Sequence, residues 1–414
     1  MRILVVSQYF HPEAFRVNDV VRGLIERRHD VTVLTGQPNY EGGEFFEGYS
    51  AFSPRYERLM GADIHRVPLV ARGGGTGSRL ALNYLTFALS SSILAPVILK
   101  SKFDAIIVYQ MSPVTMAFPA FVLKKLRNIP VLFWVQDLWP ETLRATGKVH
   151  SEQLHRWMGK LVGGMYRASD MVLVESEAFL DAIRETGLPS HRVAYLPEWA
   201  ESFYRPCSVS DEAKEAREMP SGFKVVFAGN IGVAQSMETI LDAALLLRDH
   251  KDIRWVFIGD GRRKEWAEQR VADLNLQEQV VFLGRRPPTA MPRYLALGDV
   301  LLVTLRSDPA FAMTIPAKLQ SYLACGRPVV AALDGEGARV VLAAGAGLAC
   351  ASEDAKGLAD AIQTMYEQSP QQRAQMGRAA RRYYLAHFER ESLLDQLEEF
   401  VRTVVQSGSV KPVN

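Results

Sequence analysis

The sequence predicts an α/β protein made of two domains, each with its own parallel sheet. Short apolar runs alternate with turn-rich loops and helical segments along the chain, which is the pattern of βαβ units. This series starts again at residues 224–228, after a polar stretch at 205–222 that is punctuated by proline and glycine. With 414 residues the chain is also too long for one hydrophobic core. Together these observations favour two domains.

The composition is that of a globular protein in a reducing compartment. Hydrophobic residues make up 48% of the chain and charged residues 23%, and the net charge of +2 gives no reason to expect nucleic acid as a partner. The cysteines Cys207, Cys325 and Cys350 show neither metal-ligand spacing nor a disulfide framework. Residues 1–10 lack the regions of a signal peptide and resemble a first core strand. We therefore expect a cytoplasmic location.

One part of the chain is locally basic and contains a long apolar segment. Residues 51–150 hold 12 Lys and Arg against 5 Asp and Glu. This excess fits a face turned to anionic lipid or to a pyrophosphate, and it fits ordinary solvated charge equally well. Residues 80–99 are uncharged between Arg79 and Lys100, which is long enough to span a bilayer. Because the segment also holds an asparagine, three consecutive serines and a late proline, we expect a buried helix or a surface anchor instead.

The first domain opens with a βαβ unit. Strands at 2–7 and 31–34 flank a helix at about 19–28, and the loop 8–18 follows the first strand. Ligands bind beyond the carboxyl ends of parallel strands, so this loop is expected to line a crevice, with the loop 35–43 on the same side.

Arg16 and Asn18 are the best polar candidates in the 8–18 loop for contact with a ligand. The alternative is that Asn18 or Asp19 caps the helix that follows, and for Asp19 the capping role is preferred.

Asp137 and Glu141 lie just past the carboxyl end of the strand predicted at 131–135, where functional groups gather. Asp137 has a second possible role as a helix N-cap, which the following Pro140 makes plausible. Further strands of this domain are predicted at 104–109, 171–174 and 193–196, and residues 197–206 are the expected crossover to the second domain.

Glycine-containing turns follow three strands of the second domain. The strands at 224–228, 255–258 and 280–283 are followed by GNIG (229–232), GDG (259–261) and GRR (284–286). The first turn precedes a helix, so its backbone amides could approach a phosphate at the helix start.

The stretch Ile315–Ala332 predicts a turn at Pro316, a helix at 317–324 that ends at Gly326, and a strand from Pro328. The first backbone N–H groups of a helix are unpaired and bind anions, and Lys318 adds a full positive charge at that end. This helix start would suit a diphosphate.

The pattern P-x-K-L-x-x-Y-x-A-C-G-x-P-V-V-A within this stretch resembles the donor-site helix of the family-4 retaining glycosyltransferases. The resemblance covers nearly the whole chain. It is strong evidence for the family and weak evidence for the substrate. It implies the GT-B fold, in which two Rossmann-like, doubly wound domains face each other across a cleft. The corresponding assignment is an acceptor-binding domain at 1–200, a linker at 201–222, a nucleotide-sugar-binding domain at 223–385, and at 386–414 a last helix that crosses back to the first domain, with a tail.

The nearest branch of that family is connected with colanic-acid and O-antigen synthesis and includes enzymes regarded as L-fucosamine transferases. The resemblance therefore implies a hexosyl or N-acetylaminosugar transferase of bacterial surface polysaccharide synthesis (O-antigen and lipopolysaccharide, capsule or exopolysaccharide). Its donor would be a UDP-sugar, such as UDP-linked N-acetyl-L-fucosamine, with no metal and no other cofactor. Its acceptor would be a polyprenyl-pyrophosphate-linked saccharide, reached by peripheral contact with the inner face of the cytoplasmic membrane.

The resemblance also assigns roles to residues. Asp137, Lys318 and Arg285 are the candidate catalytic residues, and Arg16, Asn18 and Glu141 are candidates on the acceptor side. The candidate nucleotide-sugar-binding residues are Gly229, Asn230, Gly232, Gln235, Gly259, Asp260, Gly284, Arg285, Pro316, Lys318 and Ser321.

The chain departs from the family pattern at several of these positions. Two glutamates of many members are replaced by Met313 and Ser321, and Gln136-Asp137 shows no histidine. Asn230 and Gln235 stand where many relatives have an arginine and a lysine for the diphosphate. Two alternatives therefore stay open beside the transferase, namely a catalytically inactive sugar-nucleotide-binding subunit and a sugar-nucleotide epimerase on the same fold.

Overall fold

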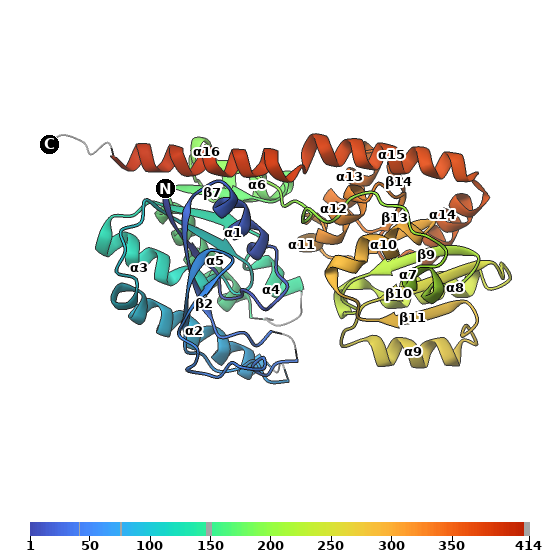
Figure 1. Ribbon diagram of the computed structural model, residues 1–414, viewed down its shortest axis with the longest axis horizontal. Helices are drawn as coiled ribbons and strands as arrows, with labels where there is room; N and C mark the ends of the chain where they lie inside the picture. Colours follow the sequence, from blue (N-terminus) through green and yellow to red (C-terminus); the bar gives the residue numbers. More distant parts are fainter. Residues whose placement is uncertain (41, 75–76, 146–150, 410–414) are drawn as a thin grey trace. The chain divides into compact units, whose positions relative to one another are not determined.

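A computed structural model describes residues 1–40, 42–74, 77–145 and 151–409 of the chain. Residue 41 of the 35–43 loop, residues 146–150 of the basic region and the last five residues of the predicted tail lie outside this description. The chain divides into two compact units (Figure 1). Unit 1 comprises Met1–Leu196 and Glu391–Asn414, and unit 2 comprises Pro197–Arg390.

Unit 1 is built on an eight-stranded sheet with the order β3-β4-β2-β1-β5-β6-β7-β8. Its strands are β1 (Arg2–Val6), β2 (Asp30–Gly36), β3 (Tyr56–Leu59), β4 (Ala62–Val67), β5 (Ala105–Gln110), β6 (Val131–Val135), β7 (Met171–Val174) and β8 (Val193–Tyr195). All neighbours are parallel except β3 and β4. The chain reverses its direction across the sheet between β1 and β5, and ligands of such sheets bind at this switch point, beyond the carboxyl ends of the strands.

The helices of unit 1 cover both faces of this sheet. They are α1 (Val17–Glu26), α2 (Gly77–Ile98), η1 (Val114–Ala117), α3 (Phe118–Arg127), α4 (Glu141–Ala145), α5 (Glu152–Ala168), α6 (Glu177–Arg184), η2 (Ser190–Arg192) and the last helix, α16 (Arg390–Ser409), from Glu391 onward. A Cβ at Gly23 would overlap the Leu394 side chain, so the glycine lets α1 and α16 approach closely. Arg27 adds ion pairs to Glu391 at 2.8 Å and to Asp395 at 2.9 Å.

Unit 2 is built on a six-stranded parallel sheet with the order β11-β10-β9-β12-β13-β14. Its strands are β9 (Phe223–Ala228), β10 (Ile253–Ile258), β11 (Val280–Gly284), β12 (Val300–Thr304), β13 (Val329–Ala332) and β14 (Gly347–Cys350). The central strands are buried on both faces, as their continuous apolar runs require, and a separate hydrophobic core lies on each side of the sheet.

The helices of unit 2 surround this sheet (Figure 1). They are α7 (Lys214–Glu218), η3 (Val233–Gln235), α8 (Met237–Leu246), α9 (Lys264–Asp273), η4 (Pro288–Ala290), α10 (Met291–Leu297), α11 (Pro309–Ala312), α12 (Ala317–Ala324), α13 (Glu336–Ala343), α14 (Ala355–Glu367) and α15 (Pro370–His387). The guanidinium of Arg381 on α15 donates a 2.8 Å hydrogen bond to the carbonyl of Ala324, the last residue of α12. This bond holds the carboxyl end of α12 in place.

The segment predicted as a linker, residues 201–222, belongs to unit 2 in the structure. Met219 is buried in the core of that unit. Glu218 binds the guanidinium of Arg286 at 3.0 Å, and Glu215 binds Arg293 at 3.0 Å. The structure accordingly divides the chain at 196 and at 390, whereas the sequence predicted divisions at 200 and 385. Residues 201–222 belong to unit 2 because polar residues that suggested a linker form ion pairs with Arg286 and Arg293 of that unit.

The first helix also starts earlier than predicted. Helix α1 begins at Val17, so Asn18 and Asp19 lie inside its first turn, and the residue at the cap position is Arg16. The interpretation of Asn18 or Asp19 as the cap is therefore wrong.

Candidate functional site

Helix α12 is fixed to the carboxyl end of β9 by the hydroxyl of Tyr322. This hydroxyl accepts a hydrogen bond from the N–H of Ala228 at 2.8 Å and donates one to the carbonyl of the same residue at 3.2 Å. Residues four apart lie on one face of a helix, so Lys318 lies one turn closer to the amino end on the same side. A Cβ at Gly229 would stand 3.4 Å from the Lys318 Nζ, and glycine at this position therefore leaves space beside the ammonium group.

The Lys318 ammonium group occupies an unusual position. The residue as a whole is half-buried, but its Nζ is buried and lies 3.8 Å from the centre of the Phe227 ring. Within the described parts of the chain this nitrogen has no hydrogen-bond partner. Burial lowers the pKa of Lys318 to about 7. A cation held without an acceptor is costly, so an anionic ligand at this point would relieve the cost.

The loops that follow β9 and β10 pack backbone against backbone. A Cβ at Gly259 would overlap the carbonyl oxygen of Gly229, and a Cβ at Gly261 would overlap that of Ile231. Both glycines have a positive φ, of 148° and 156°. The N–H of Ile231 donates a 2.8 Å hydrogen bond to the carbonyl of Asp260, which joins the two loops. Only glycine permits this approach, because any side chain would enter the neighbouring backbone.

The structure brings together the three glycine turns that the sequence singled out. The N–H of Gly229 donates to the carbonyl of Ile258 at 2.9 Å, and the N–H of Gly259 donates to the carbonyl of Gly284 at 3.0 Å. Gly229, Gly259 and Gly284 thus line one edge of the sheet, at the carboxyl ends of β9, β10 and β11. Arg285 follows directly and is exposed at the same edge.

The loop after β9 is held by a hydrogen bond of its own. As predicted, residues 229–236 form the loop between β9 and α8, and within this loop the short helix η3 and the cap residue Ser236 lie between Gly232 and α8. The Gln235 side chain accepts a 3.2 Å hydrogen bond from the N–H of Gly232, so both groups are used within the loop. The contact of Gly232 and Gln235 with the nucleotide sugar stays a prediction. Asn230, by contrast, is exposed.

The remaining predicted residues of unit 2 hold the local backbone. Pro316 occupies the cap position before α12. Ser321 is 6% exposed, and its hydroxyl donates to the carbonyl of Ala317 at 3.4 Å. Asp260 is exposed and accepts a 2.8 Å hydrogen bond from the N–H of Gly261. Met313, like Ser321, stands where many family members have a glutamate, and it is the C-cap residue of α11.

Asp137 joins the ends of two strands in unit 1. Its Oδ2 accepts a 2.8 Å hydrogen bond from the backbone N–H of Ser112, which lies beyond β5, while Asp137 itself follows β6. Helix α4 begins only at Glu141, so the alternative of Asp137 as the N-cap is wrong. Glu141 lies in the first turn of that helix.

Glu175 is a candidate that the sequence reasoning did not select. It follows β7 directly and is 5% exposed, and within the described residues its Oε1 has no hydrogen-bond partner. Burial raises the pKa of Glu175 well above its ordinary value, and the charge of Asp137 raises it further, while Arg16 acts in the opposite direction. Asp137 and Glu175 follow β6 and β7, and Arg16 lies in the loop after β1, so all three lie at the carboxyl edge of this sheet. An acid placed immediately after a fully apolar strand was the signal that could have identified Glu175.

Asn18 and the buried Glu13 hold the loop after β1 in position. The Glu13 carboxylate accepts hydrogen bonds from the N–H groups of Asn39 at 2.8 Å and Tyr40 at 2.7 Å, which ties this loop to the one after β2. Burial raises the pKa of Glu13 to about 7. The Asn18 amide accepts from the N–H of His11 at 2.9 Å and donates to the Glu13 carbonyl at 2.7 Å. Asn18 therefore has a structural role in this loop, and its predicted contact with the acceptor stays a prediction.

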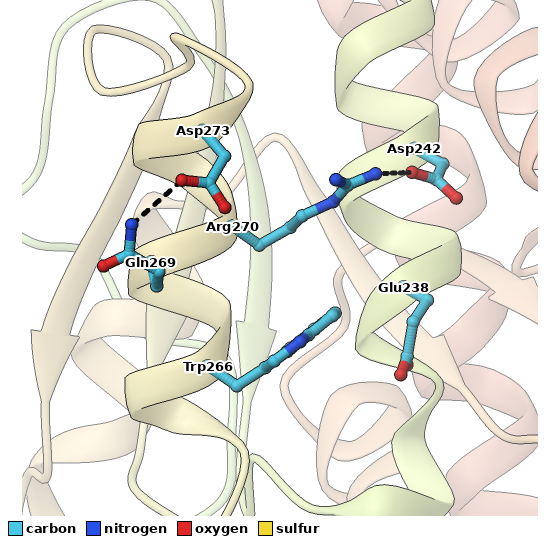
Figure 2. A pocket seen from close by; sticks show the side chains of 6 residues that line it. All are labelled: Glu238, Asp242, Trp266, Gln269, Arg270 and Asp273. Atoms are coloured by element: carbon cyan, nitrogen blue, oxygen red, sulfur yellow. Dashed lines mark hydrogen bonds and ion pairs between the residues drawn. The ribbon is translucent and has the colours of Figure 1, made fainter.

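A separate hollow of about 280 Å³ lies between α8 and α9 (Figure 2). Its polar side chains satisfy one another, since Arg270 binds Asp242 at 3.6 Å and Gln269 donates to Asp273 at 2.9 Å. The Trp266 ring that projects into the hollow is covered by the guanidinium of Arg263 at 3.6 Å. These pairs indicate a contact between two helices and not a ligand site.

Comparison with known proteins gives matches over both units. The family model "Glycosyl transferase 4-like domain" matches residues 14–199, and the model "Glycosyl transferases group 1" matches residues 222–368. The chain is 27% identical to WcaI of Escherichia coli (strain K12), named as a colanic acid biosynthesis glycosyl transferase, over 79% of this chain and 82% of that protein. It is 27% identical to a protein of Pseudomonas aeruginosa named as the glycosyltransferase WbjE, over 56% of this chain and 59% of that one.

Solved structures share the fold of this chain. Sucrose-phosphate synthase from Thermosynechococcus elongatus aligns with a TM-score of 0.75 at 18% identity, over 98% of this chain and 99% of that one. HepE of Anabaena, solved in complex with UDP and glucose, aligns with a TM-score of 0.69 at 17% identity, over 97% and 100%. At this level of identity the likeness establishes the fold, and it confirms the predicted class of two Rossmann-like parallel sheets.

Proposed function

Because the chain is a glycosyltransferase of GT-B type, we propose that it is a retaining enzyme of bacterial surface polysaccharide synthesis. It transfers a sugar, N-acetylated as in N-acetyl-L-fucosamine, from a UDP-sugar to a polyprenyl-pyrophosphate-linked saccharide. The resemblance of the 316–331 pattern and the colanic acid biosynthesis in the name of WcaI support this assignment. UDP in the HepE complex supports a UDP-linked donor.

The observation that carries the proposal is the buried Lys318 ammonium, which faces the space left by Gly229 and has no acceptor within the described residues. In the proposed reaction the bond from the sugar C1 to the diphosphate oxygen breaks, and the acceptor hydroxyl oxygen forms a new bond to C1 and passes its proton to the leaving diphosphate. Negative charge develops on the leaving diphosphate. Lys318 neutralises this charge, with Arg285 as the second cation at the same edge. The remaining requirement is to hold the reactants in position.

The acceptor is proposed to bind unit 1 at the cluster of Asp137, Glu175 and Arg16, with Glu141 nearby in α4. The carboxyl groups offer hydrogen bonds to sugar hydroxyls, and Arg16 offers a cation for the acceptor pyrophosphate. A lipid-linked acceptor requires peripheral contact with the inner face of the cytoplasmic membrane, and the enzyme is proposed to work there. The proposed reaction uses no metal and no further cofactor.

A second candidate is a catalytically inactive sugar-nucleotide-binding subunit. Met313 and Ser321, at the two positions where many family members have a glutamate, favour it, because neither side chain supplies a carboxylate. In this case the donor site would bind its nucleotide sugar without turnover.

The first test is a thermal-shift panel of nucleotides and sugar nucleotides, since a ligand of the folded state raises the melting temperature. The ligands that bind are then incubated with the protein, with and without polyprenyl-pyrophosphate mono- and disaccharides. Release of UDP only with an acceptor supports the transferase, and binding without turnover supports the inactive subunit. A product epimer formed without acceptor would assign the chain to the epimerases instead.

A further inference from the structure

Helix α2 is apolar on two opposite sides. Its inner side packs against the sheet and α3, and Asn83, Phe87 and Ala95 are buried there. Its outer side carries large apolar side chains at helical spacing, each from 43% to 69% exposed: Leu82, Leu85, Leu89, Ile93 and Val97. We call this set the outer stripe. An exposed apolar surface of this extent marks a place of interaction.

A groove of about 570 Å³ adjoins the outer stripe and shares Leu89 with it. Its walls are largely apolar and include Phe45, Leu69 and Phe52, of which Phe52 is 63% exposed. Its charged members are Glu44 and Arg79. The groove extends the apolar surface from the helix towards the loop that contains Phe45 and Phe52.

Positive charge brackets the outer stripe. The described residues 77–103 contain no Asp or Glu, and exposed Arg79 precedes the stripe while exposed Lys100 and Lys102 follow it. The exposed Leu126 and Lys125 of α3 lie beside this second end, because the Arg127 guanidinium donates a 2.8 Å hydrogen bond to the Pro96 carbonyl of α2. An apolar surface between two basic ends is complementary to an anionic lipid surface, which offers acyl chains next to negative headgroups.

The inner side of α2 shows that the helix does not leave the sheet. By length and composition alone α2 could cross a membrane, and it is the one helix of the described chain that could. The buried amide of Asn83, however, accepts from the Gln8 side chain at 2.8 Å and donates to the Val70 carbonyl at 2.6 Å. The Ser90 hydroxyl donates to the Pro68 carbonyl at 2.6 Å. Crossing a bilayer would break these bonds and leave the partners buried without replacements.

We propose that the outer stripe and its adjoining groove are the surface by which unit 1 docks on an anionic lipid bilayer, with α2 lying in the interface along the membrane plane. The outer leucines, isoleucine and valine enter the acyl boundary, and the basic residues at both ends remain among the headgroups. This proposal rests on the proposed function in one respect, since a lipid-linked acceptor has to be reached at a membrane. It adds the surface and the orientation of α2.

The test uses the full-length protein and flotation with vesicles of phosphatidylglycerol and phosphatidylethanolamine, compared with phosphatidylcholine alone. The stripe variant is Leu85→Glu with Ile93→Glu. The matched control is Leu246→Glu with Leu342→Glu, two leucines of unit 2 that are each 59% exposed. We expect wild type and control to bind anionic vesicles, and the stripe variant to lose at least tenfold in binding. Added salt should weaken wild-type binding, because screening shortens the reach of surface charge to ~8 Å at physiological ionic strength.

Three results would overturn the proposal. The first is undiminished vesicle binding by the stripe variant. The second is resistance of the wild type to high salt and carbonate, which would indicate a span. The third is a wild-type dimer in light scattering that the stripe variant converts to a monomer, which would assign the outer stripe to a second copy of the chain.

Folding and donor binding are measured separately. If the stripe variant has a lower melting temperature than the wild type, Leu85→Ser with Ile93→Ser replaces it. Charge reversal by Lys100→Glu with Lys102→Glu tests the contribution of the basic end alone. Thermal shift with the sugar nucleotide should be equal in wild type and variants. If the wild type binds vesicles but no sugar nucleotide, the result would support the docking surface and refute the proposed function.

Discussion

Binding of the sugar nucleotide is expected to be coupled to uptake of a proton by Lys318. Burial without an acceptor lowers the pKa of this ammonium to about 7, so at pH 7 about half of the free protein carries it uncharged. A diphosphate bound next to Nζ favours the charged form and returns the pKa towards its ordinary value. The protein must then take up the missing proton when the ligand binds.

The size of the effect follows from this displacement of the pKa. A change from about 7 back to the ordinary value of 10.5 corresponds to roughly 5 kcal/mol of coupling at most. Proton uptake should be close to zero at pH 5.5, about half a proton at pH 7 and close to one proton at pH 8.5. Below pH 7 the affinity should be independent of pH, because Lys318 is already charged. Above pH 7 it should fall about tenfold per pH unit, since only the charged fraction is ready to bind.

The assay is calorimetric titration in buffers of different ionisation enthalpy, where the slope of the observed enthalpy gives the protons taken up. The ligand is a UDP-sugar and not UDP, because a terminal phosphate titrates with a pKa near ~6 and would add protons of its own. Lys318→Met is the control, with similar length and no charge, and it should show no uptake and a flat pH dependence. Equal uptake by wild type and Lys318→Met, or none by wild type at pH 8, would refute the reasoning.

Three further predictions concern other residues of the two units. Asp137→Asn should lower turnover and leave donor affinity and melting temperature nearly unchanged, because an amide oxygen can still accept from the Ser112 N–H; equal turnover would remove Asp137 from the candidate catalytic residues. Glu175→Gln should flatten the pH dependence of stability. Since burial raises the pKa of Glu175, the folded state keeps a proton that the unfolded state has lost, so the free energy of unfolding of the wild type falls as pH rises. Urea unfolding at pH 5 and pH 8 measures this fall, and an equal fall in wild type and variant would contradict the prediction. Tyr322→Phe should lower the stability of unit 2 by roughly 2 kcal/mol and weaken binding of the sugar nucleotide. Tyr384→Phe, which removes a 3.2 Å bond to the Ala200 carbonyl in the same unit, should affect stability without weakening donor binding; a similar loss of affinity in both variants would count against Tyr322 as a positioning residue.

The two parallel sheets could be predicted from the sequence, because strands that are buried on both faces have continuous apolar runs. The strand predicted at 224–228 is β9 (Phe223–Ala228) in the structure. Strands β3 and β4 were not predicted, since charged residues interrupt their pattern. Arg66 of β4 is buried, pairs with Glu57 of β3 and donates a 3.1 Å hydrogen bond to the Gly36 carbonyl. An ion pair of this kind cannot be predicted from the sequence until the partner strand is known.

The candidate site was predictable in outline but not in its electrostatics. Glycine turns after strands gave Gly229, Gly259 and Gly284, because the carboxyl ends of neighbouring parallel strands share one edge. The isolation of Lys318 and the burial of Glu175 depend on side chains far away in the sequence, so no local pattern carries them.

The absence of two family glutamates does not by itself remove the means to bind and neutralise a diphosphate. A carboxylate beside the donor sugar acts on the sugar, whereas the leaving group needs positive charge and backbone donors. Unit 2 supplies the charge at Lys318, and the Tyr322 hydroxyl holds it in place by binding both backbone groups of Ala228. An inactive subunit would need affinity alone and would gain nothing from a lysine that is only partly charged in the free protein. A lysine that becomes fully charged when the ligand binds instead concentrates its favourable interaction on the diphosphate, whose negative charge grows as the sugar leaves. The proton-uptake measurement therefore also bears on whether the donor site is built for turnover.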